Sequence, residues 1–371
     1  MSDKGVTEVK EKTKFLSHKE LIWRRFKKNR LGMIGGLVVI LLTSISIFAP
    51  FFSPYDYTAT DNEKAYKSFA EINFVDEEGD FHLRPFVYSM KQEFDDQTWE
   101  RVYVPDTSTR YPIRLFHRSW EYELFGFIES DLHLFGVDSP AELHLFGTDE
   151  LGRDLLSRII YGGRVSIAIG IIGSMITAII GSLVGGVSGY FSGIIDVLLQ
   201  RIIEMIRMFP TLPLMMGLSA AIPVTWSPVI ILIAVMFIMI MVRWTSMARQ
   251  IRGKVLSYRK QEFVEAAKAA GGGDFYIITK HILTNCTSHI IVVTTLAIPQ
   301  LILAESSLSF LGLGIQPPMV SWGVLLSKAT NIQTVGQYPW IMTPGIVILI
   351  TILAFNFLGD GLRDAADPYG Q

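Results

Sequence analysis

Only a few side chains in this 371-residue sequence could take part in a reaction, and they do not form a catalytic set. Glu305 is the one charged residue deep inside an apolar run, and Ser306, Ser307 and Ser309 follow it. No histidine or lysine stands near these serines in the sequence, so no general base is at hand to activate them. Because an intramembrane hydrolase needs polar catalytic groups in two apolar segments, this pattern argues against an enzyme.

Metal and nucleotide chemistry are not indicated either. The seven histidines lack the spacing of metal ligands, and Cys286 is the single cysteine, which excludes internal disulfides and multi-cysteine metal sites. The glycines at 271–273 precede Asp274 without the Lys-Ser/Thr pair of a phosphate-binding loop. We therefore expect no cofactor in this chain.

The elements that must position these residues are apolar helices. Half of the residues are hydrophobic and 18% are charged, and about 20 consecutive apolar residues can cross a bilayer. The predicted spans are 31–53, 165–187, 208–222, 229–242, 290–311 and 343–358. The third is the least regular because Pro210 and Pro213 interrupt it. The sequence predicts an all-α polytopic membrane protein with six transmembrane helices.

Lysine and arginine set the expected orientation, since these residues favour cytoplasmic loops. Residues 1–30 hold ten of them against four acids, and 243–280 hold eight more. The short connections at 223–228 and 312–342 hold only Lys328. We expect both termini and the basic loop in the cytoplasm, with the segment after the first span outside.

The basic loop contains the most informative pattern. Glu265, Ala266 and Ala267 are followed by Gly271 and, ten positions later, by His281. The stretch from 262 to 270 favours a short helix with a small-residue face, stopped by glycines. Without further context, it could also be an ordinary amphipathic surface helix.

This arrangement resembles the cytoplasmic EAA loop of membrane subunits in bacterial ABC importers. The segments 144–170 (HLFGTDELGRDLLSRIIYGGRVSIAIG) and 302–326 (ILAESSLSFLGLGIQPPMVSWGVLL) are similar to the C-type subunit of dipeptide and oligopeptide permeases. The resemblance covers 20–55 and 144–370. It implies a type I importer permease fold and a role for Glu265, Ala266, Ala267, Gly271 and His281 in coupling to an ATPase.

The resemblance also implies partners. These are a homologous second permease in a heterodimer, two subunits that bind ATP and Mg and hydrolyse ATP, an extracytoplasmic substrate-binding protein, and the lipid of a bacterial or archaeal inner membrane. No nucleic acid is expected. This chain would form half of the translocation path for dipeptides or oligopeptides, while nickel or oligosaccharides are the alternative cargo. A secondary transporter is the alternative from another class of transport protein, and it would need paired intramembrane charges and internal repeats.

Glu305 has two candidate roles, because an ionisable residue inside a span is a functional candidate by default. It could line the path and meet the ammonium group of a peptide, or it could pair with a polar group on a neighbouring helix. Gln300, after Pro299 in the same helix, is a second candidate path residue in a kinked, partly polar span.

Two departures from the family remain. Thr284 stands where the family usually has proline, and we expect Thr284 and Asn285 to cap the next helix instead. The first extracytoplasmic loop is unusually long. We expect residues 62–118 to form a compact strand-containing layer that buries its aromatic rings against itself or the partner permease, namely Phe74, Phe81, Phe86, Tyr88, Phe94, Trp99 and Tyr103. We expect an interfacial helix within 1–30, a strand-containing insertion at 54–143, a core permease domain at 144–362 with its EAA loop at 245–285, and a cytoplasmic end at 363–371.

Overall fold

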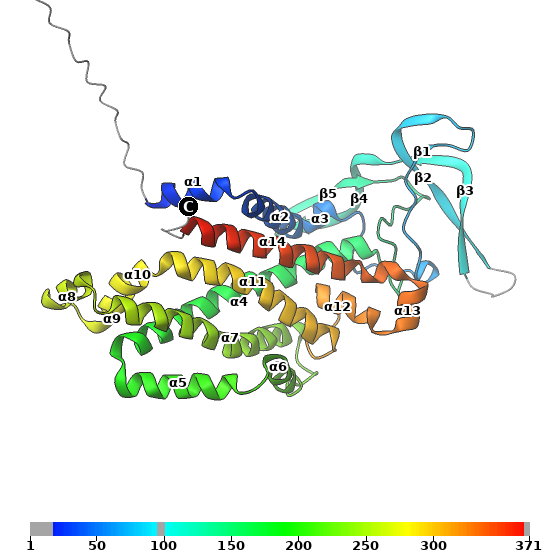
Figure 1. Cartoon of the computed structure of the whole chain (residues 1–371). Helices are drawn as coiled ribbons and strands as arrows, with labels where there is room; N and C mark the ends of the chain where they lie inside the picture. The colour runs from blue at the N-terminus through cyan, green and yellow to red at the C-terminus, as the bar shows by residue number, and fades with distance from the viewer. Residues whose placement is uncertain (1–17, 95–100, 367–371) are drawn as a thin grey trace, which may run out of the picture.

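The computed structural model describes residues 18–94 and 101–366. The remaining parts of the expected terminal segments, 1–17 and 367–371, lie outside the described residues. The chain forms a bundle of helices with strands at one end and the short helix α8 at the other (Figure 1). The helical elements are α1 (His18–Lys28), α2 (Arg30–Ile47), α3 (Ala49–Phe52), η1 (Asn62–Lys64), α4 (Leu155–Phe191), α5 (Gly193–Arg207), α6 (Thr211–Ser219), α7 (Pro228–Tyr258), α8 (Glu262–Ala269), α9 (Asp274–Tyr276), the π-helical segment η2 (Ile277–Ile282), α10 (Leu283–Asn285), α11 (Thr287–Phe310), α12 (Trp322–Leu326), η3 (Ser327–Thr330), α13 (Ile332–Gln337), η4 (Pro339–Met342) and α14 (Thr343–Ala366).

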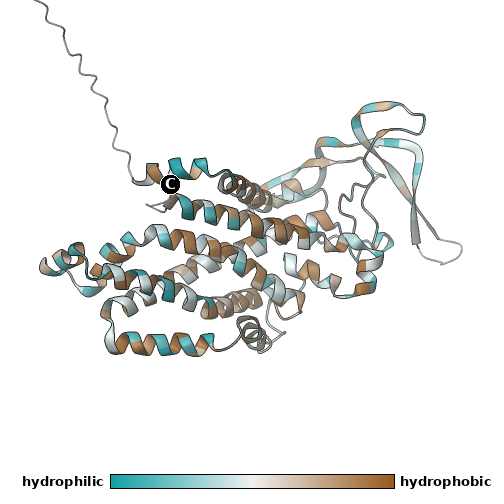
Figure 2. Cartoon of the chain, in the orientation of Figure 1, coloured by the Kyte–Doolittle hydropathy of each residue, from teal (hydrophilic) through white to brown (hydrophobic). Residues whose placement is uncertain are grey.

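Among the described residues, five helices are long and apolar enough to cross a membrane, namely α2, α4, α7, α11 and α14 with the turn before it. A sixth span exists if α5 and α6 count as one element, although they are bent by 80° at the break between them. The predicted third span, 208–222, is therefore not one membrane-spanning helix, because the helix in this range, α6, has only nine residues. Apolar residues cover the long helices, whereas α8 and the strands are more hydrophilic (Figure 2).

Helix α4 is the centre of the bundle and packs mainly against α7 and α11. Asp154 caps its N-terminus, since its carboxylate accepts a hydrogen bond from the Ser157 N–H at 2.8 Å. A side chain at Gly170 would meet Ile302 of α11, and one at Gly185 would overlap the Ala248 carbonyl of α7. The small face of α4 is therefore a close helix–helix seam, as small residues allow in lipid.

The strands lie between α3 and α4 in the sequence, within the expected insertion. They are β1 (Asn73–Val75), β2 (Phe81–Phe94), β3 (Arg101–Pro112), β4 (Arg114–Leu124) and β5 (Ile128–Gly136). All pairings are antiparallel, and they form one sheet of order β1-β2-β3 and one β4-β5 hairpin. The predicted strands around residues 101–105 and 111–116 are confirmed.

The expectation that this region buries its aromatic rings holds only in part. Phe86 is 2% exposed, but Phe74 and Phe81 remain 46% and 69% exposed. Phe94 and Trp99, which the same expectation included, are among the residues whose side chains are not described. The β4-β5 hairpin instead contacts α3 at the first span: His133 hydrogen-bonds the Pro50 carbonyl at 2.9 Å.

The α4–α7 seam predicts the effect of one methyl group. Gly185→Ala should lower the stability of the folded protein by about 1–3 kcal/mol, because the added carbon overlaps a backbone oxygen that cannot move aside. Thermal unfolding of the detergent-purified protein measures it. Gly217→Ala in α6 is the matched control, since no atom lies within 4 Å of the new carbon. Equal melting temperatures for the two variants would contradict the seam.

Candidate functional site

The predicted short helix of the basic loop is present as α8 (Glu262–Ala269), and its end is defined by backbone hydrogen bonds. Gly271 has a φ of +80°, and its N–H donates to the Lys268 carbonyl at 2.9 Å. The Gly272 N–H donates to the Ala267 carbonyl at 3.0 Å. This is a Schellman ending, in which a glycine takes the left-handed conformation that other residues adopt only with strain. Gly271 therefore turns the chain sharply back towards the bundle.

Apolar side chains on one face anchor α8 to the membrane helices, since Phe263 and Ala267 pack against the same cluster as Val264. Val264 is fully buried in an apolar cluster with Ile251 and Val255 of α7 and with Ile277 and Ile282 of η2. The opposite face of α8 is exposed to solvent at Glu265, Ala266 and Ala269. We call this exposed surface of Glu265, Ala266 and Ala269 the α8 face, and the rings of Phe275 and Tyr276 in the following α9 are exposed as well. The α8 face offers a second protein a small, shallow surface on a firmly seated helix.

The five predicted coupling residues do not all lie on the α8 face. Glu265 and Ala266 are exposed, with Glu265 paired to Lys268 at 3.2 Å, and Gly271 is exposed in the turn. Ala267 and His281 are half-buried. The His281 ring packs edge-on against Tyr276 at 5.4 Å between centroids, so it supports the loop from beneath.

The expected capping by Thr284 and Asn285 is wrong. The Thr284 hydroxyl donates to the Thr279 carbonyl and the Asn285 amide to the His281 carbonyl, so both side chains bond the preceding turn. Helix α11 is preceded by Cys286, whose side chain makes no capping hydrogen bond. The chain stays nearly helical from Asp274 onwards through the π-helical segment, and a helix that does not begin at 286 needs no cap there.

Asp196 of α5 has its principal partner on another helix. Both of its oxygens accept hydrogen bonds from Arg252 of α7 at 2.6 Å. The Ser188 hydroxyl of α4 donates to Asp196 at 2.5 Å and accepts from Gln200. This contact joins α4, α5 and α7 at the end of the bundle that bears α8. Only a fold can bring together residues 56 positions apart.

Glu305 of α11 is fully buried between helices. Its carboxylate accepts hydrogen bonds from Ser321 at 2.7 Å, Ser309 at 2.8 Å and Ser166 of α4 at 3.2 Å. The Ser166 hydroxyl in turn accepts from the Trp322 N–H at 3.1 Å. The geometry favours the second of the two roles considered for Glu305, a polar lock between α4, α11 and the start of α12.

Gln300 faces a cavity of about 230 Å³ between α4, α7 and α11. Its side-chain oxygen accepts a hydrogen bond from Arg243 of α7 at 2.7 Å. The predicted span 229–242 left Arg243 at a membrane edge, whereas α7 continues to Tyr258 and Arg243 is at its midpoint. This arginine was not among the predicted site residues, because the expected basic loop began with it.

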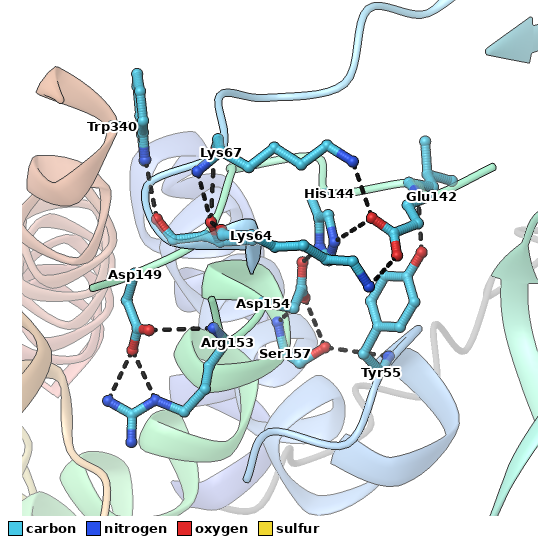
Figure 3. A network of polar contacts seen from close by, with 12 residues as sticks. Tyr55, Lys64, Lys67, Glu142, His144, Asp149, Arg153, Asp154, Ser157 and Trp340 are labelled. Carbon is cyan, nitrogen blue, oxygen red and sulfur yellow. Dashed lines mark hydrogen bonds and ion pairs between the residues drawn. The ribbon is translucent and has the colours of Figure 1, made fainter. Parts of the chain in front are cut away.

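A second polar cluster joins the insertion to the start of α4 (Figure 3). The Lys67 ammonium pairs with Glu142 at 2.8 Å, Lys64 pairs with the other oxygen of Glu142, and His144 bonds Asp154 at 2.9 Å. Burial alone would raise the pKa of Glu142, but hydrogen bonds from His144 and the two lysines hold it well below its ordinary value. Burial lowers the pKa of His144, and the carboxylates of Asp154 and Glu142 outweigh it, so the pKa is raised.

The same cluster extends to η4, just before the last span. The Thr148 hydroxyl donates to the Lys64 carbonyl at 2.5 Å, and the Trp340 indole donates to the Thr148 carbonyl at 3.1 Å. Residues before, after and far beyond the strands therefore meet at the N-terminus of α4. The cluster fixes the insertion to the helices.

Removing the Glu305 carboxylate tests its role as a lock. Glu305→Ala should lower stability by roughly 3 kcal/mol, because it opens a cavity and leaves serine hydroxyls without an acceptor. Glu305→Gln keeps the shape and one acceptor oxygen and should cost about 1 kcal/mol. Thermal unfolding and uptake are measured together. A path role would be indicated if Glu305→Gln abolished uptake at unchanged stability.

The His144 cluster predicts a pH-dependent stability. A raised pKa means that the contribution of His144 is complete below the ordinary histidine value of 6.5 and is lost as pH rises through the folded-state value. The lowered pKa of Glu142 makes its contribution disappear in acid, below about 4.5. The melting-temperature difference between wild type and His144→Asn should therefore shrink from pH 6 to pH 9. A difference that is constant over this range would contradict the ion pair.

Comparison with known proteins agrees with this architecture. Residues 178–369 match the family described as binding-protein-dependent transport system inner membrane component, and residues 20–68 match the N-terminal TM domain of oligopeptide transport permease C. The oligopeptide transport system permease protein OppC of Escherichia coli K12 is 44% identical over 223 residues, covering 60% of this chain and 71% of that protein.

Two further relatives align over almost the whole chain. The dipeptide transport system permease protein DppC of Bacillus subtilis 168 is 32% identical over 353 residues, which is 95% of this chain and 86% of that protein. The glutathione transport system permease protein GsiD of Escherichia coli O157:H7 is 33% identical over 346 residues, 93% of this chain and 89% of that protein. The family match covers more than half of the sequence. This chain belongs to the family of inner-membrane components of binding-protein-dependent transport systems.

Proposed function

We propose that this chain forms half of the translocation path of an ATP-driven importer for dipeptides or oligopeptides. The observation that carries the coupling role is the α8 face, a small-residue surface on a helix whose buried Val264 packs against α7. A motion imposed on α8 by another protein would reach the membrane helices through this contact. The relatives described above are permeases for oligopeptides, dipeptides and glutathione, which favours peptides over nickel or oligosaccharides.

The proposed partners follow from this role. A homologous second permease completes the path, two ATP-binding subunits dock on the α8 faces and bind ATP and Mg, and an extracytoplasmic protein delivers the substrate. ATP hydrolysis belongs to these partner subunits. Glu265, Ala266, Ala267, Gly271 and His281 are the proposed coupling set, with Ala267 and His281 supporting the exposed members.

The proposed orientation places α8 in the cytoplasm and the strands outside. The basic residues of 243–280 support it, because lysine and arginine favour the cytoplasmic side. The α8 face and the strands lie at opposite ends of the bundle, as this arrangement requires (Figure 1). Both termini then belong to the cytoplasm, and 54–143 is an extracytoplasmic insertion positioned to contact the substrate-binding protein.

A bulky residue on the α8 face tests the coupling role. Ala266→Trp should leave the subunit folded, because the side chain points away from the chain's own core, but should reduce co-purifying ATPase subunits and peptide uptake to about a tenth or less, since losing about 1.4 kcal/mol of docking energy weakens binding tenfold.

Gly336→Trp on α13 is the control for a bulky residue at an exposed position of the other end. It should leave the bound ATPase subunits unchanged. Normal ATPase binding and uptake in the Ala266→Trp complex would exclude α8 as the docking helix.

Thiol labelling tests the orientation. Single cysteines at Glu77 and Ser257, both exposed positions, are placed in a Cys286→Ser background. A membrane-impermeant maleimide added to intact cells should label the cysteine at 77 and reach the one at 257 only after the membrane is permeabilised. Labelling of position 257 in intact cells would overturn the proposed topology.

A further inference from the structure

The cavity between α4, α7 and α11 is lined by one positively charged side chain, Arg243, and by no carboxylate. Its polar lining residues are Ser174, Thr177, Arg243, Ser246, Gln250, Thr294 and Gln300, and none of the lining residues is acidic. Arg243 donates to the Gln300 side-chain oxygen at 2.7 Å and more weakly to the Gln300 carbonyl at 3.4 Å. Its Nε is buried and has no hydrogen-bond partner among the described residues. The guanidinium is thus incompletely satisfied by this chain.

The position of Arg243 makes an incompletely hydrogen-bonded guanidinium energetically costly. It lies at the midpoint of α7, about 22 Å along the helix from Pro228 at 1.5 Å per residue, whereas an apolar bilayer core is about 30 Å thick. A charged group at such a depth faces a protein interior or a water-filled path, because exposing it to acyl chains is unfavourable. Glu305, the buried acid of α11, is already engaged by four serines.

Contact with lipid does not explain the cavity. Its walls carry hydroxyl and amide groups from three helices, and Ser246 and Gln300 are exposed in the isolated chain. The lipid-facing surfaces of α2 and α14 look different, with exposed side chains such as Leu37, Ile40 and Ile346. This cavity therefore lies on the side of the subunit that borders the translocation path or the second permease.

We propose that this cavity binds the C-terminal carboxylate of a peptide as it crosses the membrane, an inference that rests on the proposed peptide-import function. A carboxylate would accept charge-assisted hydrogen bonds from the terminal nitrogens of Arg243, because each of them has two N–H groups and makes one hydrogen bond to Gln300. The Ser246 hydroxyl lies on the same wall and can donate a further bond. Gln300 holds the guanidinium in place, and it is a positioning residue.

Charged thiol reagents test the site in the assembled complex. Thr294→Cys introduces a thiol into the cavity of a Cys286→Ser background, with reactive cysteines of the partner subunits removed. An anionic sulfonatoethyl methanethiosulfonate should react faster than its cationic trimethylammonium counterpart, because the arginine attracts anions. Arg243→Gln should reduce this preference about tenfold or more, and Arg243→Lys should retain it.

A thiol at Ser257, near the end of α7 and outside the cavity, is the control, and its reagent preference should not respond to Arg243→Gln. Peptides are the second probe. Millimolar trialanine should slow the labelling of Thr294→Cys, whereas trialaninamide, which lacks the carboxylate, should not, and neither should protect the Arg243→Gln variant.

Three results would overturn the inference: an anion preference that survives Arg243→Gln, equal protection by trialanine and its amide, or no reaction with either reagent. The last would mean that the second permease fills the cavity. Failure of the proposed function is distinguishable, since it would appear as absence of peptide uptake by the wild-type complex, whatever the reagent preference at position 294.

Discussion

The close approach of α4 to α7 and α11 is the constraint on which the rest of the molecule depends. In lipid, helices gain no hydrophobic energy from meeting each other, so association relies on close packing and buried polar contacts. The glycines of α4 provide the first, since Gly181 and Gly185 lie against Met247 and Ala248. Ser166 provides the second through Glu305. Together they hold α7 and α11 at fixed positions on the two sides of one cavity.

The same seam connects that cavity to α8. Helix α7 runs without a break from Pro228 to Tyr258, contributing Arg243 to the cavity and Ile251 and Val255 to the cluster that receives Val264. The ion pair between Arg252 and Asp196 fixes α5 to the same stretch. A displacement of α8 can therefore reach the cavity through one continuous helix, whose intermediate part is held by α4.

Much of the fold could be predicted from local patterns, because apolar runs, glycine spacing and basic loops each act over short distances. Five of the six predicted spans, the α8 helix with Gly271 at its end and the strands of the insertion are of this kind. The partners of Glu305, Asp196 and Arg243 were beyond such reasoning, since they come from helices distant in sequence. Thr284 was misjudged for a related reason: the π-helical segment carries the chain past the position where a cap was expected.

The most direct test of this account is whether nucleotide bound by the partner subunits changes access to the cavity. In the assembled complex, the rate at which an impermeant thiol reagent labels Ser246→Cys is compared without nucleotide and with a non-hydrolysable ATP analogue and Mg. Movement of α8 transmitted through α7 predicts a several-fold difference between the two states from the cytoplasmic side. Identical rates in a complex that binds the analogue and transports peptide would contradict the account.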